Sequence, residues 1–259
     1  MQCILCIPVR WIAKTRWGLE LFNGPEVRER TSKTRAYMRA WDFDQADDSE
    51  LWRDDDGFDA AQEAIASRES DPERSFRTLL RLARKGSLGS MVQVGWCYSA
   101  GKGVVADTVQ AEQWFARAAE SGSKWAAVCL ARIRWPRGDL DGCEKAFGTS
   151  LSTDWAPALY WTARCRVKRS NTRETFKAVR PLLERAADAG SPAAGVLLGR
   201  LLADGRGGLL GVLRGYVLMI ETMTSVARAI REAEEAAASH SAEGSASTGP
   251  GAANLKKAA

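Results

Sequence analysis

The chain has 259 residues, a net charge of +5 and 45% hydrophobic residues. This length and apolar content allow a buried core in one or two domains and exclude a wholly disordered chain. The one histidine, His240, lies in a small, polar C-terminal stretch, so the folded part lacks the commonest general base and metal ligand. We therefore expect no enzyme activity, no catalytic residues, no cofactor and no metal site.

Residues 1–41 contain several tryptophans but no clear pattern, and we expect an N-terminal extension whose structure the sequence leaves open. Six scattered cysteines and the lack of a secretory signal favour a reducing compartment and buried thiols, with Cys3 and Cys6 too few for a zinc site. We therefore expect the protein to be located in the cytoplasm. A mitochondrial presequence is the alternative, because the first nineteen residues carry basic side chains and no acid.

Residues 42–70 begin with an acidic run, in which Arg53 is the one basic residue up to position 59. This run predicts a solvated linker, followed by a helix before residue 70. The alternative is a calcium loop, in which Asp54, Asp56, Gly57 and Glu63 take ligand or turn positions. Trp52 stands at the first ligand position of that loop, so we favour the linker.

The region 71–235 repeats itself. Origins at Gly86, Gly122, Asp154 and Gly190 are separated by 36, 32 and 36 residues, and spacings in this range are typical of helical repeats. Small or apolar residues recur at fixed distances after each origin. Four positions after come Ser90, Ala126, Ala158 and Ala194; eight after come Val94, Leu130, Thr162 and Leu198; nine after come Gly95, Ala131, Ala163 and Gly199.

The glycines of Gly101-Lys-Gly103-Val-Val-Ala fit the spacing of a dinucleotide-binding turn. Such a turn needs a preceding strand, whereas residues 91–98 show helical spacing. Gly205 and Gly207 follow Gly190 at the distances at which Gly101 and Gly103 follow Gly86. We therefore interpret these glycines as the turn within a helical hairpin. In the two middle units other residues replace them.

The first unit resembles the Sel-one-like repeat family, a relative of the tetratricopeptide repeats. The matching positions are Ser90, Val94, Gly95, Tyr98, Gly101, Gly103, Val104, Asp107, Ala111, Trp114, Ala118, Ala119 and Gly122. The last unit matches at Ala194, Leu198, Gly199, Gly205 and Gly207 but lacks the tyrosine. The resemblance implies an all-α solenoid of about four antiparallel helix pairs, which acts as a non-catalytic scaffold or adaptor for other proteins.

Helical geometry separates two faces of the first helix of each unit. The recurring small residues lie on one face, which we expect to pack. The opposite face, which we expect to line the concave surface, carries a column ten positions after each origin: Trp96, Arg132, Arg164 and Arg200. Trp125, Tyr160 and Trp135 lie beside it. Arginine binds carboxylates and stacks on aromatic rings. The column therefore predicts a groove that binds an acidic peptide or a chain-end carboxylate.

Three alternatives remain open at this stage. The arginines could be a solvated face with the tryptophans as core residues. The basic stretch 164–180 could bind RNA phosphates, with Tyr160 and Trp161 for stacking. The acidic run 42–59 could fold back over the arginine column as an internal occupant.

The sequence after Gly211 predicts a long helix with one apolar side. We expect it to cap the repeats, with dimerisation as the alternative and the oligomeric state open. Its most apolar run, residues 209–220, is shorter than the ~20 residues of a membrane span, so we expect no span. Residues 236–259 predict a disordered tail.

Overall fold

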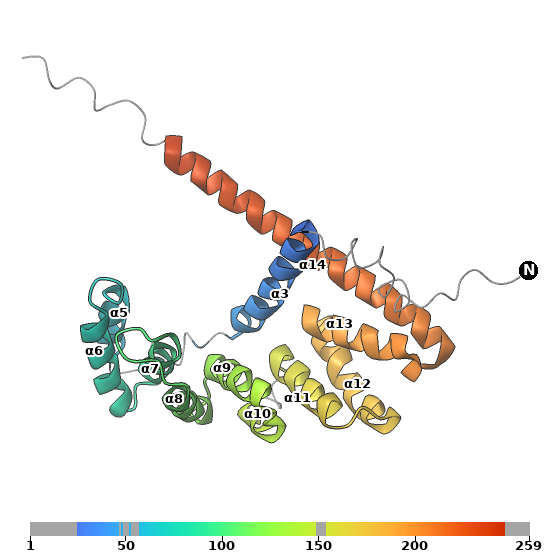
Figure 1. The fold of residues 1–259 in the computed structure, drawn as a ribbon, viewed down its shortest axis with the longest axis horizontal. Coiled ribbons are helices and arrows are strands. Elements are labelled where there is room, and N and C mark those ends of the chain that lie inside the picture. Colours follow the sequence, from blue (N-terminus) through green and yellow to red (C-terminus); the bar gives the residue numbers. More distant parts are fainter. Residues whose placement is uncertain (1–24, 47, 49–51, 53–56, 149–153, 247–259) are drawn as a thin grey trace, which may run out of the picture. The chain divides into compact units, whose positions relative to one another are not determined.

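The structure is a computed structural model that describes residues 25–46, 48, 52, 57–148 and 154–246. Every element in these residues is helical (Figure 1). The helices are α3 (Pro25–Asp44), α5 (Phe58–Ala66), α6 (Pro72–Arg84), α7 (Leu88–Ala100), α8 (Thr108–Glu120), α9 (Lys124–Arg134), η1 (Trp135–Arg137), α10 (Leu140–Ala146), α11 (Ala156–Arg169), α12 (Arg173–Asp188), α13 (Pro192–Leu201), η3 (Leu202–Arg206) and α14 (Gly208–Ala246).

The chain forms two compact units: residues 40–220, and residues 1–39 together with 221–259. In the larger unit each helix from α5 to α13 packs against the next one in chain order, so the predicted all-α solenoid of helix pairs is confirmed. Helix α5 lies in the region predicted as linker and helix. The domain boundaries at 71 and 235 stay a prediction. Helix α14 extends to Ala246, so the first part of the predicted tail is helical, and residues 247–259 lie outside the described ones.

All four predicted origins have left-handed backbone conformations. The φ angles are 107° at Gly86, 97° at Gly122, 89° at Gly190 and 54° at Asp154, which is the one non-glycine residue with positive φ among those described. The next residue caps the following helix. The serine side chains at 87, 123 and 191 each accept a hydrogen bond from the backbone N–H three positions on, and Trp155 takes this place without a side-chain cap in the third unit. Each unit therefore starts with the same reversal of the chain.

The recurring small residues make the close helix contacts of the core. The residues four positions after each origin are fully buried in all four units. A Cβ on Gly95 would come within 2.7 Å of the Phe115 ring, and one on Gly199 within 2.6 Å of Met219 Cγ. At these positions only glycine lets the neighbouring helix approach.

The turn glycines behave differently in the two units that keep them. Gly101 and Gly103 have φ of 70° and 71°, and Gly101 ends α7. In the last unit Gly205 has φ of 84°, but the second left-handed residue is Gly208, because Gly207 has an ordinary φ of −91°. The turn of the second unit is also made by a glycine, Gly138 with φ of 76°, directly after η1. The turns of the first and last units, which the sequence predicted to be equivalent, therefore share their first left-handed glycine but not the position of the second.

Tyr98 and Trp114, the two aromatic repeat positions of the first unit, lie where α6, α7 and α8 pack together. Tyr98 meets the Phe76 ring edge-on, with the centroids 5.3 Å apart. Trp114 is buried, and the Arg117 guanidinium lies 5.0 Å from its ring centroid. Both aromatic residues therefore hold the first helix pair against the preceding helix.

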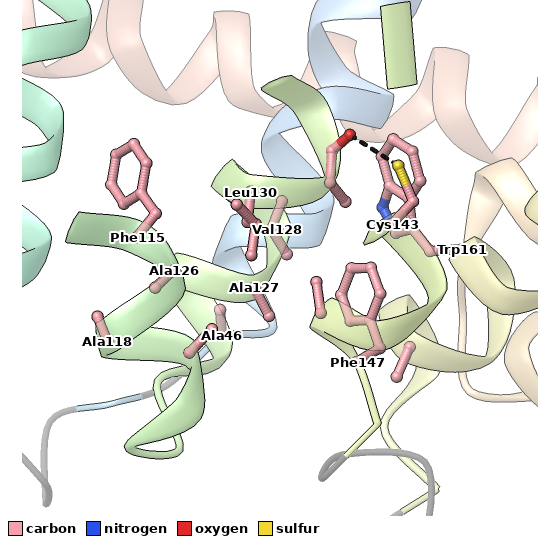
Figure 2. Packing of buried hydrophobic residues seen from close by; sticks show 14 of the residues in the cluster. Ala46, Phe115, Ala118, Ala126, Ala127, Val128, Leu130, Cys143, Phe147 and Trp161 are labelled. Carbon is pink, nitrogen blue, oxygen red and sulfur yellow. Dashed lines mark hydrogen bonds between the residues drawn. The ribbon is translucent and has the colours of Figure 1, made fainter. Parts of the chain in front are cut away.

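Three linked clusters form the core of the larger unit. The central one runs from α7 to α11 and includes Phe115, Leu130, Phe147 and Trp161 (Figure 2). Helix α11 contributes its other side to the next cluster, with α12 and α13, and α7 contributes Val94 and Cys97 to the preceding one. Core helices with two packed sides connect the repeats.

A pattern of ion pairs joins the first unit to the second and recurs between the second and the third. Glu112 of α8 accepts from Arg134 at 2.7 Å and Arg137 at 2.6 Å, which follow it by 22 and 25 residues. Glu144 of α10 accepts from arginines at the same two spacings in α11, residues 166 and 169. In the first two units, an acid of the second helix therefore holds the carboxyl end of the next unit's first helix.

Helix α14 carries an exposed apolar stripe that begins at its first turns. It consists of Leu209, Leu210, Leu213, Tyr216, Val217, Ile220 and Met223. Residues 208–239 are long and apolar enough to cross a membrane by length and composition, which differs from the prediction from residues 209–220. Length and composition do not establish a span, and the opposite side of α14 packs closely on α13 at Gly199 and Gly215.

Candidate functional site

Arg164 of α11 is enclosed by aromatic rings. Its guanidinium lies 4.0 Å from the centroid of the Trp135 ring and 4.7 Å from that of Trp161. The Tyr160 ring is 5.8 Å away, and the rings of Trp135 and Trp161 meet edge to face at 5.9 Å. Cation–π contacts of this kind fix the plane of the guanidinium. Two of the three predicted aromatic neighbours, Trp135 and Tyr160, therefore contact a predicted arginine.

Arg132 of α9 is bound to the end of α3. Its guanidinium lies 4.3 Å from the centroid of the Phe43 ring, and one of its nitrogens is 3.6 Å from Asp42 Oδ2. The Phe43 ring also packs at 4.9 Å against the ring of Trp125, the third predicted aromatic neighbour. We define the arginine face as the side chains of Arg132, Arg164, Trp125, Trp135, Tyr160 and Trp161, and the acidic segment as residues 41–48, of which residue 47 is not described.

Asp42 is a buried carboxyl group within the arginine face. Only 3% of the residue is exposed, and Oδ2 accepts a hydrogen bond from Trp161 Nε1 at 3.2 Å. Burial raises the pKa of Asp42 above its ordinary value, although the Trp161 hydrogen bond and the Arg132 charge act in the opposite direction. Oδ1 has no hydrogen-bond partner among the described residues. The carboxylate is therefore accommodated with an energetic cost.

Asp48 is bound at the amino end of α9. Its Oδ2 accepts from Ser123 Oγ at 2.6 Å and from the Trp125 N–H at 3.2 Å, while Oδ1 accepts from the Lys124 N–H at 3.0 Å. These backbone groups have no partner within their own helix, and the helix dipole favours a negative charge there. This carboxylate, 5% exposed, is therefore well satisfied.

The backbone between these two acids is also held. The Gln45 carbonyl accepts from Trp155 Nε1 at 2.9 Å, and Ala46 is buried in the central core cluster with residues of α8, α9 and α11 (Figure 2). The solvated linker predicted for this run is wrong at Asp42 and Asp48. Both carboxylates are buried and accept hydrogen bonds from donors 119 and 75 residues away. The calcium-loop alternative falls mainly on residues outside the described ones.

The other two members of the predicted column, Trp96 and Arg200, are not among the side chains that define the arginine face. Trp96 stacks with Arg68, whose guanidinium is 4.4 Å from the ring centroid. Arg200 is exposed in the last turn of α13, and the described residues provide it with no acidic or aromatic partner. A binding surface shared by all four column positions stays a prediction. The sequence reasoning also did not include Ser123 and Trp155, since their roles depend on the acidic segment.

The basic stretch 164–180 is partly neutralised. Arg166 and Arg169 pair with Glu144, Arg169 also pairs with Asp141, and Arg180 pairs with Glu184 at 2.8 Å. Arg173, Lys177 and Arg180 line an open hollow with Arg206, which donates to the Asn171 and Thr172 carbonyls. Few of these cations are therefore available as an unbroken surface for phosphates.

The described cysteines pack in or against the hydrophobic core. Cys97, Cys143 and Cys165 are buried, Cys129 is partly buried, and all four are free thiols. Burial raises the pKa of the Cys97 and Cys129 thiols, and Cys143 Sγ donates to the Ala131 carbonyl at 3.4 Å (Figure 2). The described part of the chain brings no three His, Cys, Asp or Glu side chains together as a set of metal ligands.

The comparisons with known proteins agree with this geometry. The Sel1 repeat family model matches residues 89–123, which confirms the resemblance for the first unit. No curated protein shows a significant match. A protective antigen of uropathogenic Escherichia coli strains with an SLR fold superposes with a TM-score of 0.53 and 22% identity, over 63% of this chain and 38% of that one. This chain thus spans well under half of that protein's length.

A Sel1 repeat protein from Oxalobacter formigenes has 20% identity and a TM-score of 0.49, over 62% of this chain and 67% of that one. At such identities a structural likeness is evidence for fold and not for partners. The chain therefore contains a Sel1 repeat at residues 89–123, and its fold is similar to that of a solved SLR protein over 63% of its length.

Proposed function

We propose that this chain is a non-catalytic protein-interaction scaffold that binds an acidic peptide segment of a partner on its arginine face. The observation that carries the proposal is the arrangement of Arg132 and Arg164 among aromatic rings, where a carboxylate and a phenyl ring from elsewhere in the chain already bind. Arginine and tryptophan dominate the binding energy of protein interfaces, because they combine large contact areas with directed polar groups. The amino end of α9 adds a second place for a carboxylate.

The scaffold role also fits the family of the matched repeat, since helix-pair repeats build extended surfaces for other proteins. Binding of RNA through residues 164–180 is less well supported, because several of those arginines are paired with acids. Charge neutralisation of this kind removes the phosphate contacts that nucleic-acid affinity requires.

The proposal can be tested by selecting peptides from a random displayed library on the full chain and measuring their affinity by fluorescence polarisation. We expect selected peptides to combine acidic and aromatic residues, and the Arg132→Ala/Arg164→Ala variant to bind them at least ten-fold more weakly. Arg173→Ala is the matched control, since it removes an arginine from the basic stretch but not from the arginine face. Arg200→Ala tests whether the fourth member of the predicted column contributes.

Two results would contradict the proposal. One is the selection of peptides without acidic residues. The other is the finding that a single-stranded RNA oligonucleotide binds more tightly than any peptide, with an affinity that falls steeply with salt and does not depend on Arg132 or Arg164.

A further inference from the structure

The acidic segment occupies the arginine face in the manner of a bound peptide. It meets the rest of the larger unit through three anchors. Asp42 and Phe43 meet Arg132, Trp161 and Trp125; the Gln45 carbonyl meets Trp155; and Asp48 meets the amino end of α9. Two carboxylates, one aromatic ring and one backbone carbonyl thus lie within residues 42–48, and each contacts a complementary group on the repeats.

The three anchors use general chemistry that another peptide could supply. The indole N–H of Trp155 binds a backbone carbonyl, which every residue carries. The amino end of α9 binds a carboxylate through N–H groups and a serine hydroxyl, and it binds no other part of that side chain. The ring of Phe43 contacts both Arg132 and Trp125, and another aromatic side chain of similar size could make the same two contacts.

The first anchor is imperfect, which makes the segment exchangeable. The Asp42 carboxylate is 3.6 Å from the Arg132 nitrogen, longer than a charge-assisted hydrogen bond. Its second oxygen has no described partner, and the buried Trp52 Nε1 farther along the chain also has none. Buried polar groups without partners destabilise the arrangement that contains them. A partner that satisfies these groups has a free-energy advantage over the chain's own residues.

The covalent connection works in the opposite direction. A tethered segment competes at an effective concentration of about millimolar, so a free peptide with identical contacts displaces it poorly. Because one anchor is imperfect and the local concentration is high, the segment should exclude weak ligands and be displaced by a strong one.

On the basis of the proposed function, we propose that the acidic segment is an internal mimic of the partner. The partner presents an acidic residue directly followed by an aromatic one, and a second acidic residue about five positions farther on. It binds by displacing Asp42, Phe43 and Asp48 from the arginine face.

The test uses a labelled peptide of residues 41–52, WDFDQADDSELW, and the full-length chain in fluorescence polarisation. We expect weak binding to the wild type and binding at least ten-fold tighter to the Phe43→Ala/Asp48→Asn variant, in which the internal anchors are removed. Adding Arg132→Ala to that variant should abolish the gain. Asp44→Asn is the matched control, because Asp44 is an exposed acid of the same segment, and it should leave the affinity unchanged.

A second measurement does not depend on the folding of the double variant. Hydrogen exchange of the backbone amides of residues 41–48 is followed in the wild-type chain, with and without a saturating library-selected acidic peptide. We expect their exchange to accelerate when the peptide binds, as the segment leaves the arginine face. Unchanged exchange with the peptide bound overturns the inference.

The outcomes separate this inference from the proposed function. If selected peptides bind through Arg132 while residues 41–48 stay protected, the mimic is wrong and the scaffold proposal stands. If no acidic peptide binds either the wild type or the double variant, both are wrong. An affinity of the double variant for the peptide equal to that of the wild type also overturns the mimic.

Discussion

Asp154 occupies the position at which the other three repeats have glycine, and its φ of 54° lies in the left-handed region. Its exposed carboxylate pairs with Arg185, an interaction worth at most ~1 kcal/mol at the surface. An L-residue other than glycine in this region costs ~1–2 kcal/mol. The third repeat therefore keeps the reversal of the chain at the expense of some backbone strain.

A pair of substitutions at this residue separates strain from the ion pair. Asp154→Gly and Asp154→Ala both remove the pairing with Arg185, but only glycine relieves the left-handed backbone. We expect the glycine variant to be more stable than the alanine variant by about 1 kcal/mol, measured by urea unfolding. Equal stabilities would mean that the backbone at residue 154 is not strained.

The buried Asp42 makes the free energy of unfolding depend on pH, and the direction of that dependence follows from its raised pKa. Because its pKa is raised in the folded state, the folded protein takes up this proton at a higher pH than the unfolded chain does. The contribution of Asp42 to stability therefore grows as the pH falls through the folded-state pKa, and it is complete below the ordinary value of 3.8.

The measurement compares wild type with Asp42→Asn by urea unfolding at several pH values. The free energy of unfolding of the wild type, minus that of the variant, should rise as the pH is lowered, by at most ~1.4 kcal/mol per pH unit. A difference that falls with decreasing pH would show that Arg132 and Trp161 outweigh the effect of burial.

At the scale of elements, glycines decide how closely α13 and α14 cross. A Cβ on Gly215 would come within 2.5 Å of the Gly199 carbonyl oxygen and 2.6 Å of the Ala203 nitrogen. Both neighbours are backbone atoms, which cannot move aside without separating the helices. Gly211, one turn earlier, has Leu202 Cδ2 at 3.7 Å as its nearest neighbour, an ordinary contact.

Alanine substitutions at these two glycines should have opposite effects. Gly215→Ala should destabilise the chain by ~1–3 kcal/mol through overpacking, and Gly211→Ala should stabilise it by ~0.5–1 kcal/mol through the better helix propensity of alanine. Thermal unfolding of both variants provides the check. A stable Gly215→Ala variant would refute the close crossing.

The exposed stripe of α14 leads to an element-scale prediction about the cap. Leu213 and Ile220 are 63% and 64% exposed, so they add little to the stability of a single chain. Leu213→Glu/Ile220→Glu should change the free energy of unfolding by about 0.5 kcal/mol or less, measured at low protein concentration. A larger loss would show that another surface covers the stripe, as the dimerisation alternative requires.

At the scale of the whole molecule, neighbouring repeats stabilise each other, because some helices pack in two core clusters at once. Phe147 is fully buried, with its ring 5.9 Å from that of Trp155 and 6.3 Å from that of Trp161. It therefore connects the short α10 with α11, whose other side belongs to the next core cluster. Repeat proteins gain stability from such contacts between neighbours.

Removal of this ring should weaken the central repeats as a group. Phe147→Ala should cost ~3–5 kcal/mol and raise hydrogen exchange in α9, α10 and α11 together. The exposed Val109→Ala serves as the control and should stay within ~0.5 kcal/mol of the wild type. Faster exchange confined to α10 would contradict the shared core.

The larger unit could be predicted because its signals are local and recur. Reversal of the chain needs a residue that tolerates positive φ, and close helix contacts need small residues. Both requirements recur in every repeat, so the corresponding residue types appear at fixed spacing in the sequence. The positions four after each origin, all fully buried, are the clearest case. The same recurrence singled out Arg132 and Arg164 as candidate binding residues, since they share one offset in neighbouring repeats.

By itself the sequence determined the helix pairs, their order and the first unit's resemblance to a Sel1 repeat, because helix periodicity and turn chemistry depend on residues close together in the chain. Only the tertiary structure decided that Asp42 and Asp48 are buried and which donors they accept hydrogen bonds from. Those outcomes depend on donors 75 to 119 residues away, and no local pattern encodes such a distant partner.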